Sequence, residues 1–452
     1  MNKIYNHVVE GFESALASKS ADERRIGAEL KFPLVDHGGN AASFETVCQL
    51  WNYLVCHGWR PVLDPMTKRI VGARKRGPHN DTIAGCETGY CKMEFSLAHV
   101  PNLFELEQQV QQLRAELEPF CEDGGVHMLG YGIQPMTPPT KKLMTKKRRT
   151  SPWSKAFGTN RHISKADGHD IHLFTINAAS HVHVSVSLEE AVDVINVLNG
   201  FSGAQIALTA NSNIWRGRID PNYKCVAEKF WDWWMPEGNR VGVPTKPFED
   251  LKDYCQTIAE LRPVYVNRAG RPIVLKGYRT FAEYFRTGRA VGIDPQGKEV
   301  SFVPEKDDID LHSTCYWYNA RLSRYYTVEN RVNDQQPPHA LVCIAALTLG
   351  LVSALDEAKR ELGRYDWQTL RAAREAACRD GPSGNVGEFR LDGLAVRMLR
   401  IARRGLQGRG LGEERFLKPL ETRAGKVRCP ADQASSLFRN GGIQNLLRTW
   451  KI

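Results

Sequence analysis

The chain has 452 residues, of which 42% are hydrophobic and 25% are charged, a balance typical of a soluble globular protein. A net charge of +10, from 61 Lys and Arg residues against 51 Asp and Glu, favours an acidic partner such as nucleotide phosphate, nucleic acid, an acidic peptide or a lipid headgroup. Eleven scattered cysteines without a CxxC pair exclude a disulfide framework and a zinc signature, as expected in a reducing compartment.

The first third of the chain predicts alternating strands and helices. Residues 1–24 lack the apolar core of a signal peptide and indicate a polar, helical lead-in, which favours a cytoplasmic location. A strand is expected over 25–36, followed by a helix that Ser43 caps. Further patterns predict strands within 59–77, 89–98 and 126–135 and a helix over 103–121.

The middle of the chain changes in composition. Residues 137–165 are rich in Pro, Thr and basic side chains and predict a long surface loop. Strand periodicity returns over 172–188 and 324–334. A long helix entered through prolines is expected over 337–362. Its apolar stretch, 340–355, is too short to span a bilayer, so no membrane partner is expected.

These patterns together predict an α+β fold with a mostly antiparallel sheet. Several strands alternate apolar with polar residues, and helices or long loops separate them, which favours an antiparallel sheet over a doubly wound one. After about residue 356 the sequence is helical, Arg-rich and punctuated by glycines. We therefore expect one domain over 1–355 and a helical C-terminal extension over 356–452.

Four predicted strands carry charged or histidine side chains at alternate positions among apolar neighbours. Positions two apart share one side of a strand, and four such strands indicate a sheet face that lines a polar cavity. Carboxylates with a histidine suit Mg²⁺ or Mn²⁺, and an arginine can meet phosphate oxygens. The pairs are Glu29 with Lys31, Lys92 with Glu94, His181 with His183, and Glu329 with Arg331.

Plainer interpretations exist for several of these features. His181 and His183 could be ordinary half-buried strand residues, and the basic segment 141–149 could be a solvated loop rather than a nucleic-acid arm. The tryptophans of FWDWWMP most simply pack, although an exposed aromatic cluster could stack a base or hold a partner. The sequence has no Walker motif, GxGxxG after a strand, or HExxH, so metals and arginines would have to hold any bound nucleotide.

Six collinear segments between about Ile26 and Leu355 resemble the glutamate–cysteine ligase superfamily, in the branch shared by plant-type enzymes and bacterial carboxylate–amine ligases. They read IGAELKFPLVD, MEFSLAHVPNLFEL, GYGIQP, HVHVSV, LTANSNIWRGR and TVENRVND. The resemblance implies a curved antiparallel sheet that forms a funnel covered by helices, as in the catalytic part of glutamine synthetase. It also implies a catalytic domain over 1–355 that binds ATP and Mg²⁺, or Mn²⁺. Such relatives join a carboxylic acid to an amine through an acyl phosphate, and they are often dimers.

The resemblance also implies roles for individual residues. Arg331 is expected at the phosphate or acyl phosphate, where a catalytic arginine would act. Arg216 and Arg218, near the substrate loop, are expected to hold a substrate carboxylate. The expected metal ligands are Glu29, Glu94, His183, Glu329 and, with looser spacing, Glu87.

Lys31 departs from the family pattern, because relatives usually carry a glutamate there that counts among the metal ligands. A protonated lysine cannot ligate a divalent ion, but it brings a positive charge near the metals, and Lys31 is expected with Arg331 among the residues that bind the cofactor. Three outcomes are open. The ammonium could take over the electrostatic role of one metal, the pocket could be reshaped for another substrate, or the enzyme could be weakened or inactive.

Three functions compete at this point. The leading hypothesis is an ATP- and Mg²⁺-dependent carboxylate–amine ligase whose substrates need not be glutamate and cysteine. A variant of it is an amide-forming tailoring enzyme that acts on a peptide or carrier in natural-product biosynthesis. The rival from another class is a non-catalytic binder of nucleic acid or protein on the ligase scaffold, supported by the basic segment 141–149 and the Arg-rich tail, although nucleic acid is the less expected partner.

Overall fold

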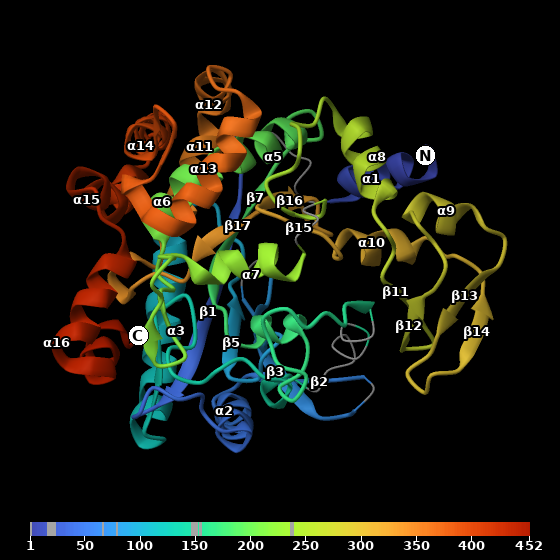
Figure 1. Ribbon diagram of the computed structural model, residues 1–452, viewed down its shortest axis with the longest axis horizontal. Coiled ribbons are helices and arrows are strands. Elements are labelled where there is room, and N and C mark those ends of the chain that lie inside the picture. The colour runs from blue at the N-terminus through green and yellow to red at the C-terminus, as the bar shows by residue number, and fades with distance from the viewer. Residues whose placement is uncertain are drawn as a thin grey trace.

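The computed structural model places a large sheet at the centre of the molecule (Figure 1). Nine strands form this sheet and pair in antiparallel fashion, so the predicted α+β fold is confirmed. The structure describes residues 2–15, 24–65, 67–77, 80–145, 152, 156–235 and 239–452. Across the sheet the strands run β16 (Ala320–Leu322), β17 (Thr327–Asp334), β7 (Ala179–Ser185), β1 (Ile26–Asp36), β5 (Lys92–Ser96), β4 (Thr82–Cys86), β3 (Ile70–Lys75) and β2 (Arg60–Leu63), with β6 (Val126–Met128) paired to β1.

The alternation of side chains in β1 sets the two faces of the sheet. Leu30 and Phe32 belong to the main hydrophobic core, which the covering helices share. Glu29 comes before Leu30 in the strand, and Lys31 lies between Leu30 and Phe32. The side chains of Glu29 and Lys31 therefore lie on the opposite face. β7 alternates in the same way, and β17 does so before its register shifts between Asn330 and Asn333, so the face toward the helices is mostly apolar and the other face is polar.

Helices cover the apolar face of the sheet. α5, α6 and α11 pack against β7, β16 or β17, and α3 packs against β1 and β6. Farther out, α13 packs on α6 and α14 packs on α11, as the upper left of Figure 1 shows. The helices are α1 (Asn2–Ser14), α2 (Phe44–Cys56), α3 (Leu103–Asp123), α5 (Ala191–Gly200), α6 (Ser202–Thr209), α7 (Val226–Trp234), α8 (Leu251–Glu260), α9 (Phe281–Arg286), α10 (Asp307–Ser313), α11 (Cys343–Ser353), α12 (Leu355–Leu362), α13 (Trp367–Asp380), α14 (Leu391–Gly408), α15 (Lys418–Lys426) and α16 (Pro430–Trp450).

Two of the predicted helices form as expected. Ser43 caps α2, and its Oγ accepts a hydrogen bond from the backbone N–H of Thr46 at 3.0 Å. The helix predicted over 103–121 is α3, which begins at Leu103 and ends two residues later than expected.

The prediction of a single long helix over 337–362 is wrong, because the chain bends by 87° between α11 and α12. The bend lies at Ala354, whose φ of −116° and ψ of 41° are not helical. α11 is apolar on all sides and buried between the sheet and α14, and a Cβ on Gly350 would come within 2.3 Å of the Ala402 carbonyl oxygen. α12 exposes a charged face instead, so the chain must turn to bring that face to the surface.

The remaining strands form small sheets beside the large one. β11 (Tyr265–Arg268), β12 (Arg271–Leu275), β13 (Ala290–Ile293) and β14 (Glu299–Phe302) make an antiparallel sheet at the right of Figure 1. Two-stranded pairs are formed by β8 (Ile214–Trp215) with β9 (Arg218–Ile219), by β10 (Val241–Gly242) with β15 (Trp317–Tyr318), and by β18 (Asn385–Val386) with β19 (Phe389–Arg390).

Two further expectations concern long segments of the chain. Part of the loop predicted over 137–165, residues 146–151 and 153–155, lies outside the described residues. After residue 356, α13 packs on α6, and α14 and α15 pack on both α6 and α11; the division of the chain at that point stays a prediction. In the described part of the chain no single helix is both long and apolar enough to cross a membrane, although two sharply bent helix pairs pass that test together.

Candidate active site

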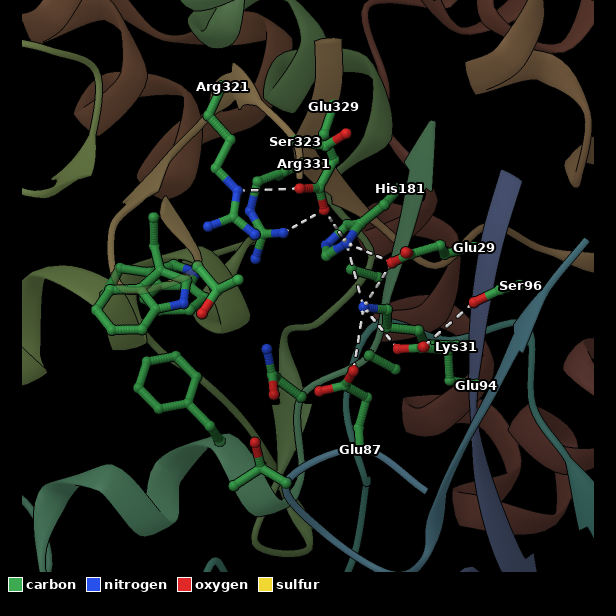
Figure 2. Close-up of a pocket in the computed structure, with 18 of the residues that line it drawn as sticks. Glu29, Lys31, Glu87, Glu94, Ser96, His181, Arg321, Ser323, Glu329 and Arg331 are labelled. Carbon is green, nitrogen blue, oxygen red and sulfur yellow. Dashed lines mark hydrogen bonds and ion pairs between the residues drawn. The ribbon is translucent and has the colours of Figure 1, made fainter. Parts of the chain in front are cut away.

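A cavity of about 550 Å³ lies against the polar face of the sheet. All eight alternating residues of the four predicted polar strands line it, so the prediction of a polar cavity is confirmed. β1, β5, β7 and β17 supply these side chains, β16 adds Arg321, and the turn after β4 adds Glu87. Figure 2 shows the charged groups gathered at one end of the cavity.

The strand registers bring residues from distant parts of the sequence together. Glu29 of β1 pairs with His181 of β7, and His183 of β7 pairs with Glu329 of β17. On the other side of β1, Lys31 pairs with Glu94 of β5. Opposite residues in an antiparallel pair have neighbouring side chains, so one line of charged groups runs across four strands.

Three of the predicted metal ligands converge at the junction of β1, β7 and β17. Within the described residues, Glu29, His183 and Glu329 form the one group of potential ligands whose donor atoms all lie within 4.8 Å of one another. His183 Nε2 is 3.3 Å from Glu29 Oε1, and its Nδ1 is 2.9 Å from Thr327 Oγ1, which orients the ring. Two carboxylates and an imidazole suit one Mg²⁺ or Mn²⁺ ion, so this group fits a divalent metal.

The electrostatics of this group favour its charged form. Burial acts to raise the pKa of Glu29, but Lys31 and the two histidines hold that pKa well below its usual range. Burial acts to lower the pKa of His183, but the hydrogen bond with Glu29 and the charge of Glu329 raise it. The carboxylates of Glu29 and Glu329 are thus ionised at neutral pH, as metal ligands must be, whereas His183 must lose its proton when it ligates an ion.

Two arginines hold Glu329 from the side away from β1. Arg321 Nε donates a hydrogen bond to Glu329 Oε2 at 3.0 Å, and Arg331 donates one to Oε1. Burial acts to raise the pKa of Glu329, but Arg331 and Arg321 hold it well below its usual range. Arg321 is not among the site residues expected from the sequence, although its place opposite Glu329 in the β16–β17 hairpin follows the same alternation.

The other two predicted metal ligands, Glu87 and Glu94, lie around Lys31. Lys31 Nζ is 3.0 Å from Glu94 Oε2, 3.2 Å from Glu29 Oε2 and 3.6 Å from Glu87 Oε1. Burial acts to lower the pKa of Lys31, but these carboxylates raise it above its usual value. Burial and the charge of Glu87 raise the pKa of Glu94 to about 8, because the carboxylates share a single ammonium.

Lys92 is a second buried amine in the cavity wall. Its Nζ donates to Asn177 Oδ1 at 2.9 Å and to the Phe174 carbonyl oxygen at 3.2 Å, and both acceptors are uncharged. Burial lowers the pKa of Lys92 to about 8. The charges of Glu87 and Glu94 act on this amine, but its hydrogen bonds within the described residues go to uncharged acceptors.

Aromatic rings form another wall of the cavity. Trp231 of α7 stacks on Trp317 with a centroid distance of 5.6 Å and lies 4.2 Å from the ring of Phe174. Trp234 also lines the cavity, whereas Trp233 stacks on His162 outside it. All three tryptophans thus pack as expected, and the periodicity of the sequence alone did not show that Trp231 and Trp234 also line the cavity.

Arg216 and Arg218 lie apart from this constellation. They are in the β8–β9 hairpin, where the Arg216 guanidinium lies 4.2 Å from the ring centroid of Trp215. Neither arginine is among the described residues that line the cavity. Their role in holding a substrate carboxylate stays a prediction.

Comparison with known sequences identifies similar proteins. The model of glutamate–cysteine ligase family 2 matches residues 25–449. A protein named "Putative glutamate--cysteine ligase 2-3" from Mycolicibacterium smegmatis is 25% identical over 332 residues, which cover 68% of this chain and 84% of that protein. A "Putative glutamate--cysteine ligase 2" from Streptomyces coelicolor is 26% identical over 352 residues, which cover 75% of each chain.

Solved structures share the fold at low sequence identity. A glutamate–cysteine ligase from Francisella tularensis, solved in complex with AMP, has a TM-score of 0.54 and 12% identity, and the match covers 94% of this chain and 88% of that one. A bifunctional glutathione synthetase from Pasteurella multocida has a TM-score of 0.51 and 10% identity, with 98% of this chain and 52% of that chain covered. These likenesses extend the fold match across almost the whole chain.

Proposed function

Because the chain belongs to glutamate–cysteine ligase family 2, we propose that it is an ATP-dependent carboxylate–amine ligase whose active site is the cavity on the polar face of the sheet. The observation that carries this proposal is the gathering of Glu29, His183 and Glu329 beside two arginines. Ligands for a divalent cation next to guanidinium groups suit phosphoryl transfer, in which negative charge accumulates on phosphate oxygens.

The proposed reaction has two steps. An amine cannot displace oxide from a carboxylate, so ATP first phosphorylates the carboxylate of the acid substrate and ADP leaves. The amine then attacks the acyl phosphate, and an amide forms as phosphate leaves. Each step moves negative charge between oxygens, which fixed positive groups stabilise.

Residues of the cavity have distinct roles in this proposal. Glu29, His183 and Glu329 would hold a Mg²⁺ or Mn²⁺ ion, which supplies charge neutralisation at the ATP phosphates. Arg331 keeps N–H groups beyond the one bound to Glu329, and these face the cavity where the transferred phosphoryl group would lie. Lys92, whose hydrogen-bond acceptors are both uncharged, is assigned to bind the carboxylate of the acid substrate.

ADP release measures the proposed activity directly. The purified chain is incubated with ATP, Mg²⁺ and a panel of amino acids, acidic peptides and amines, and amide products are identified by mass spectrometry. Glutamate with cysteine is the first pair, and formation of γ-glutamylcysteine would identify a standard ligase. A panel that yields neither ADP nor an amide contradicts the proposal.

Substitution of Arg331 separates a ligase from a binding protein on the same scaffold. Arg331→Gln removes a positive group from the proposed phosphoryl site and should lower the rate about 10²–10³-fold. The control is Arg403→Gln, since Arg403 contacts Glu421 on the surface away from the cavity. Equal rates for both variants and the wild type would contradict the assigned role of Arg331.

Other expectations about the activity stay predictions. An amide-forming tailoring enzyme that acts on a peptide or carrier would release ADP only with a large acidic acceptor. A non-catalytic nucleic-acid binder would bind in a salt-sensitive manner that Arg331→Gln leaves unchanged. The buried position of the charged groups in the cavity favours a small-molecule site over such a binding surface. A homodimer, which the family resemblance implies, and a cytoplasmic location also stay predictions.

A further inference from the structure

The Lys31 ammonium is enclosed by three carboxylates and a histidine ring of the protein itself. Carboxylate oxygens of Glu94, Glu29 and Glu87 lie 3.0, 3.2 and 3.6 Å from Nζ, and His181 Nδ1 lies 3.1 Å away. Figure 2 shows the amine at the centre of these groups. Only 6% of the Lys31 surface is exposed, so solvent does not compete for these contacts.

This enclosure decides what the amine can do. An ammonium has three N–H donors, and three carboxylates and the His181 ring already contact it within 3.6 Å. A substrate or a phosphate could reach this amine only by displacing one of these contacts, so the geometry favours an electrostatic role over the direct cofactor contact expected for Lys31. Its remaining role is that of a fixed positive charge among three carboxylates.

The same enclosure excludes a divalent ion from this space. A Mg²⁺ ion contacts carboxylate oxygens at about 2.0–2.1 Å, and an ion that touched two of these carboxylates would have to displace the amine. Two positive charges at such a short distance would also repel each other strongly. The ammonium and a metal are therefore alternative occupants of one space.

Glu29 divides its two oxygens between the two halves of the site. Oε1 faces His183 at 3.3 Å, on the side of the three potential ligands from β1, β7 and β17. Oε2 faces the Lys31 ammonium at 3.2 Å. A carboxylate that bridges two cations has this arrangement, and here one of the two cations is part of the chain.

We propose that the Lys31 ammonium is a built-in monovalent cation that takes the place of a second divalent metal between Glu29, Glu87 and Glu94. The site then holds one divalent ion, at Glu29, His183 and Glu329. The inference deepens the proposed function, because it sets the number of metals available to the ligase reaction. Of the three outcomes that the sequence left open for Lys31, the geometry points to the first.

Metal stoichiometry tests the proposal without reference to activity. The metal-free full-length protein is titrated with Mn²⁺ alone, and free Mn²⁺ is measured by electron paramagnetic resonance. We expect one Mn²⁺ per chain for the wild type and two for Lys31→Glu, which removes the ammonium and adds a ligand. Lys92→Gln is the matched control, since it removes a neighbouring buried amine outside the enclosure and should keep the count at one.

Two features keep the test decisive. Lys31→Glu gathers four carboxylates and could fail to fold without metal, so Lys31→Gln and the wild type are also crystallised with Mn²⁺. One anomalous peak beside His183 in the wild type supports the proposal, and a second peak between Glu87 and Glu94 overturns it. A wild-type count other than one, or a folded Lys31→Glu that binds one Mn²⁺, overturns it as well. ADP release is scored separately, so a ligase with two metals would refute this inference and leave the proposed function standing.

Discussion

Replacement of Glu329 by glutamine should destabilise the protein although the side chain keeps its size. The carboxylate is only 4% exposed, and the arginines it binds, Arg321 and Arg331, are 12% and 13% exposed. Arg321 also donates to the Tyr316 carbonyl oxygen, whereas among the described residues the Arg331 guanidinium forms an ion pair with Glu329 alone. Glu329→Gln therefore removes the nearest counter-charge of a buried guanidinium.

The size of the effect follows from burial and chain length. Removal of one partner from a buried ion pair costs about 3–5 kcal/mol. Unfolding entropy of about 2.1 cal/mol/K per residue, over 452 residues, gives about 0.95 kcal/mol/K. The thermal midpoint should therefore fall by about 3–5 °C at pH 7.5 in the absence of metal and nucleotide.

Calorimetry or circular dichroism measures this shift against a matched control. Glu421 makes a similar contact with Arg403, but their side chains are 24% and 38% exposed, so Glu421→Gln should cost at most about 1 kcal/mol, or about 1 °C. Glu329→Gln combined with Arg331→Gln should recover part of the loss, because both members of the pair are then neutral.

The pH dependence provides an independent check on the same residue. The pKa of Glu329 is lower in the folded protein than in the unfolded chain, so its contribution is complete above the unfolded pKa and is lost as the pH falls through the folded value. The difference between wild type and variant should thus shrink in strong acid. An unchanged or higher midpoint for Glu329→Gln at pH 7.5 would refute the counter-charge argument.

Three other predictions concern the walls of the cavity. The pKa of Lys92 is lowered to about 8, so above that pH the unfolded chain binds more protons than the folded protein. The free energy of unfolding, measured with urea, should therefore rise more between pH 8 and pH 10 in the wild type than in Lys92→Gln. Parallel curves for the two proteins would contradict this. Nucleotide or substrate in the cavity should quench tryptophan fluorescence, and Trp231→Phe should lose more of this quenching than Trp450→Phe, which lies outside the cavity; equal losses would show that binding occurs elsewhere. A Cβ on Gly89 would lie 1.9 Å from the Thr175 carbonyl oxygen, so Gly89→Ala should lower the thermal midpoint by several degrees, whereas Gly408→Ala meets no atom within 4 Å and should leave the midpoint equal or higher.

The sequence determined which side of each strand faces the cavity. Period-two alternation follows from the pleat of a single strand, so the pairs Glu29 with Lys31 and Glu329 with Arg331 could be placed on one face before any fold was known. Ser43 could likewise be identified as a helix cap, because capping depends on residues within one turn. The anomaly of Lys31 was also visible at this level, since it is a difference of residue type at one position.

Only the tertiary structure decided which of these side chains meet. Strand order and register place Glu94 beside Lys31 and His183 beside Glu29, and neither follows from the pattern of one strand. The break at Ala354 and the separation of Trp233 from the cavity depend on packing against elements far away in the chain. Alternation is a local property of the backbone, whereas an ion pair between strands requires the two strands to lie close together in the correct register. For that reason the sequence could show Lys31 as a departure, and only the arrangement of Glu29, Glu87 and Glu94 around it could show what the departure does.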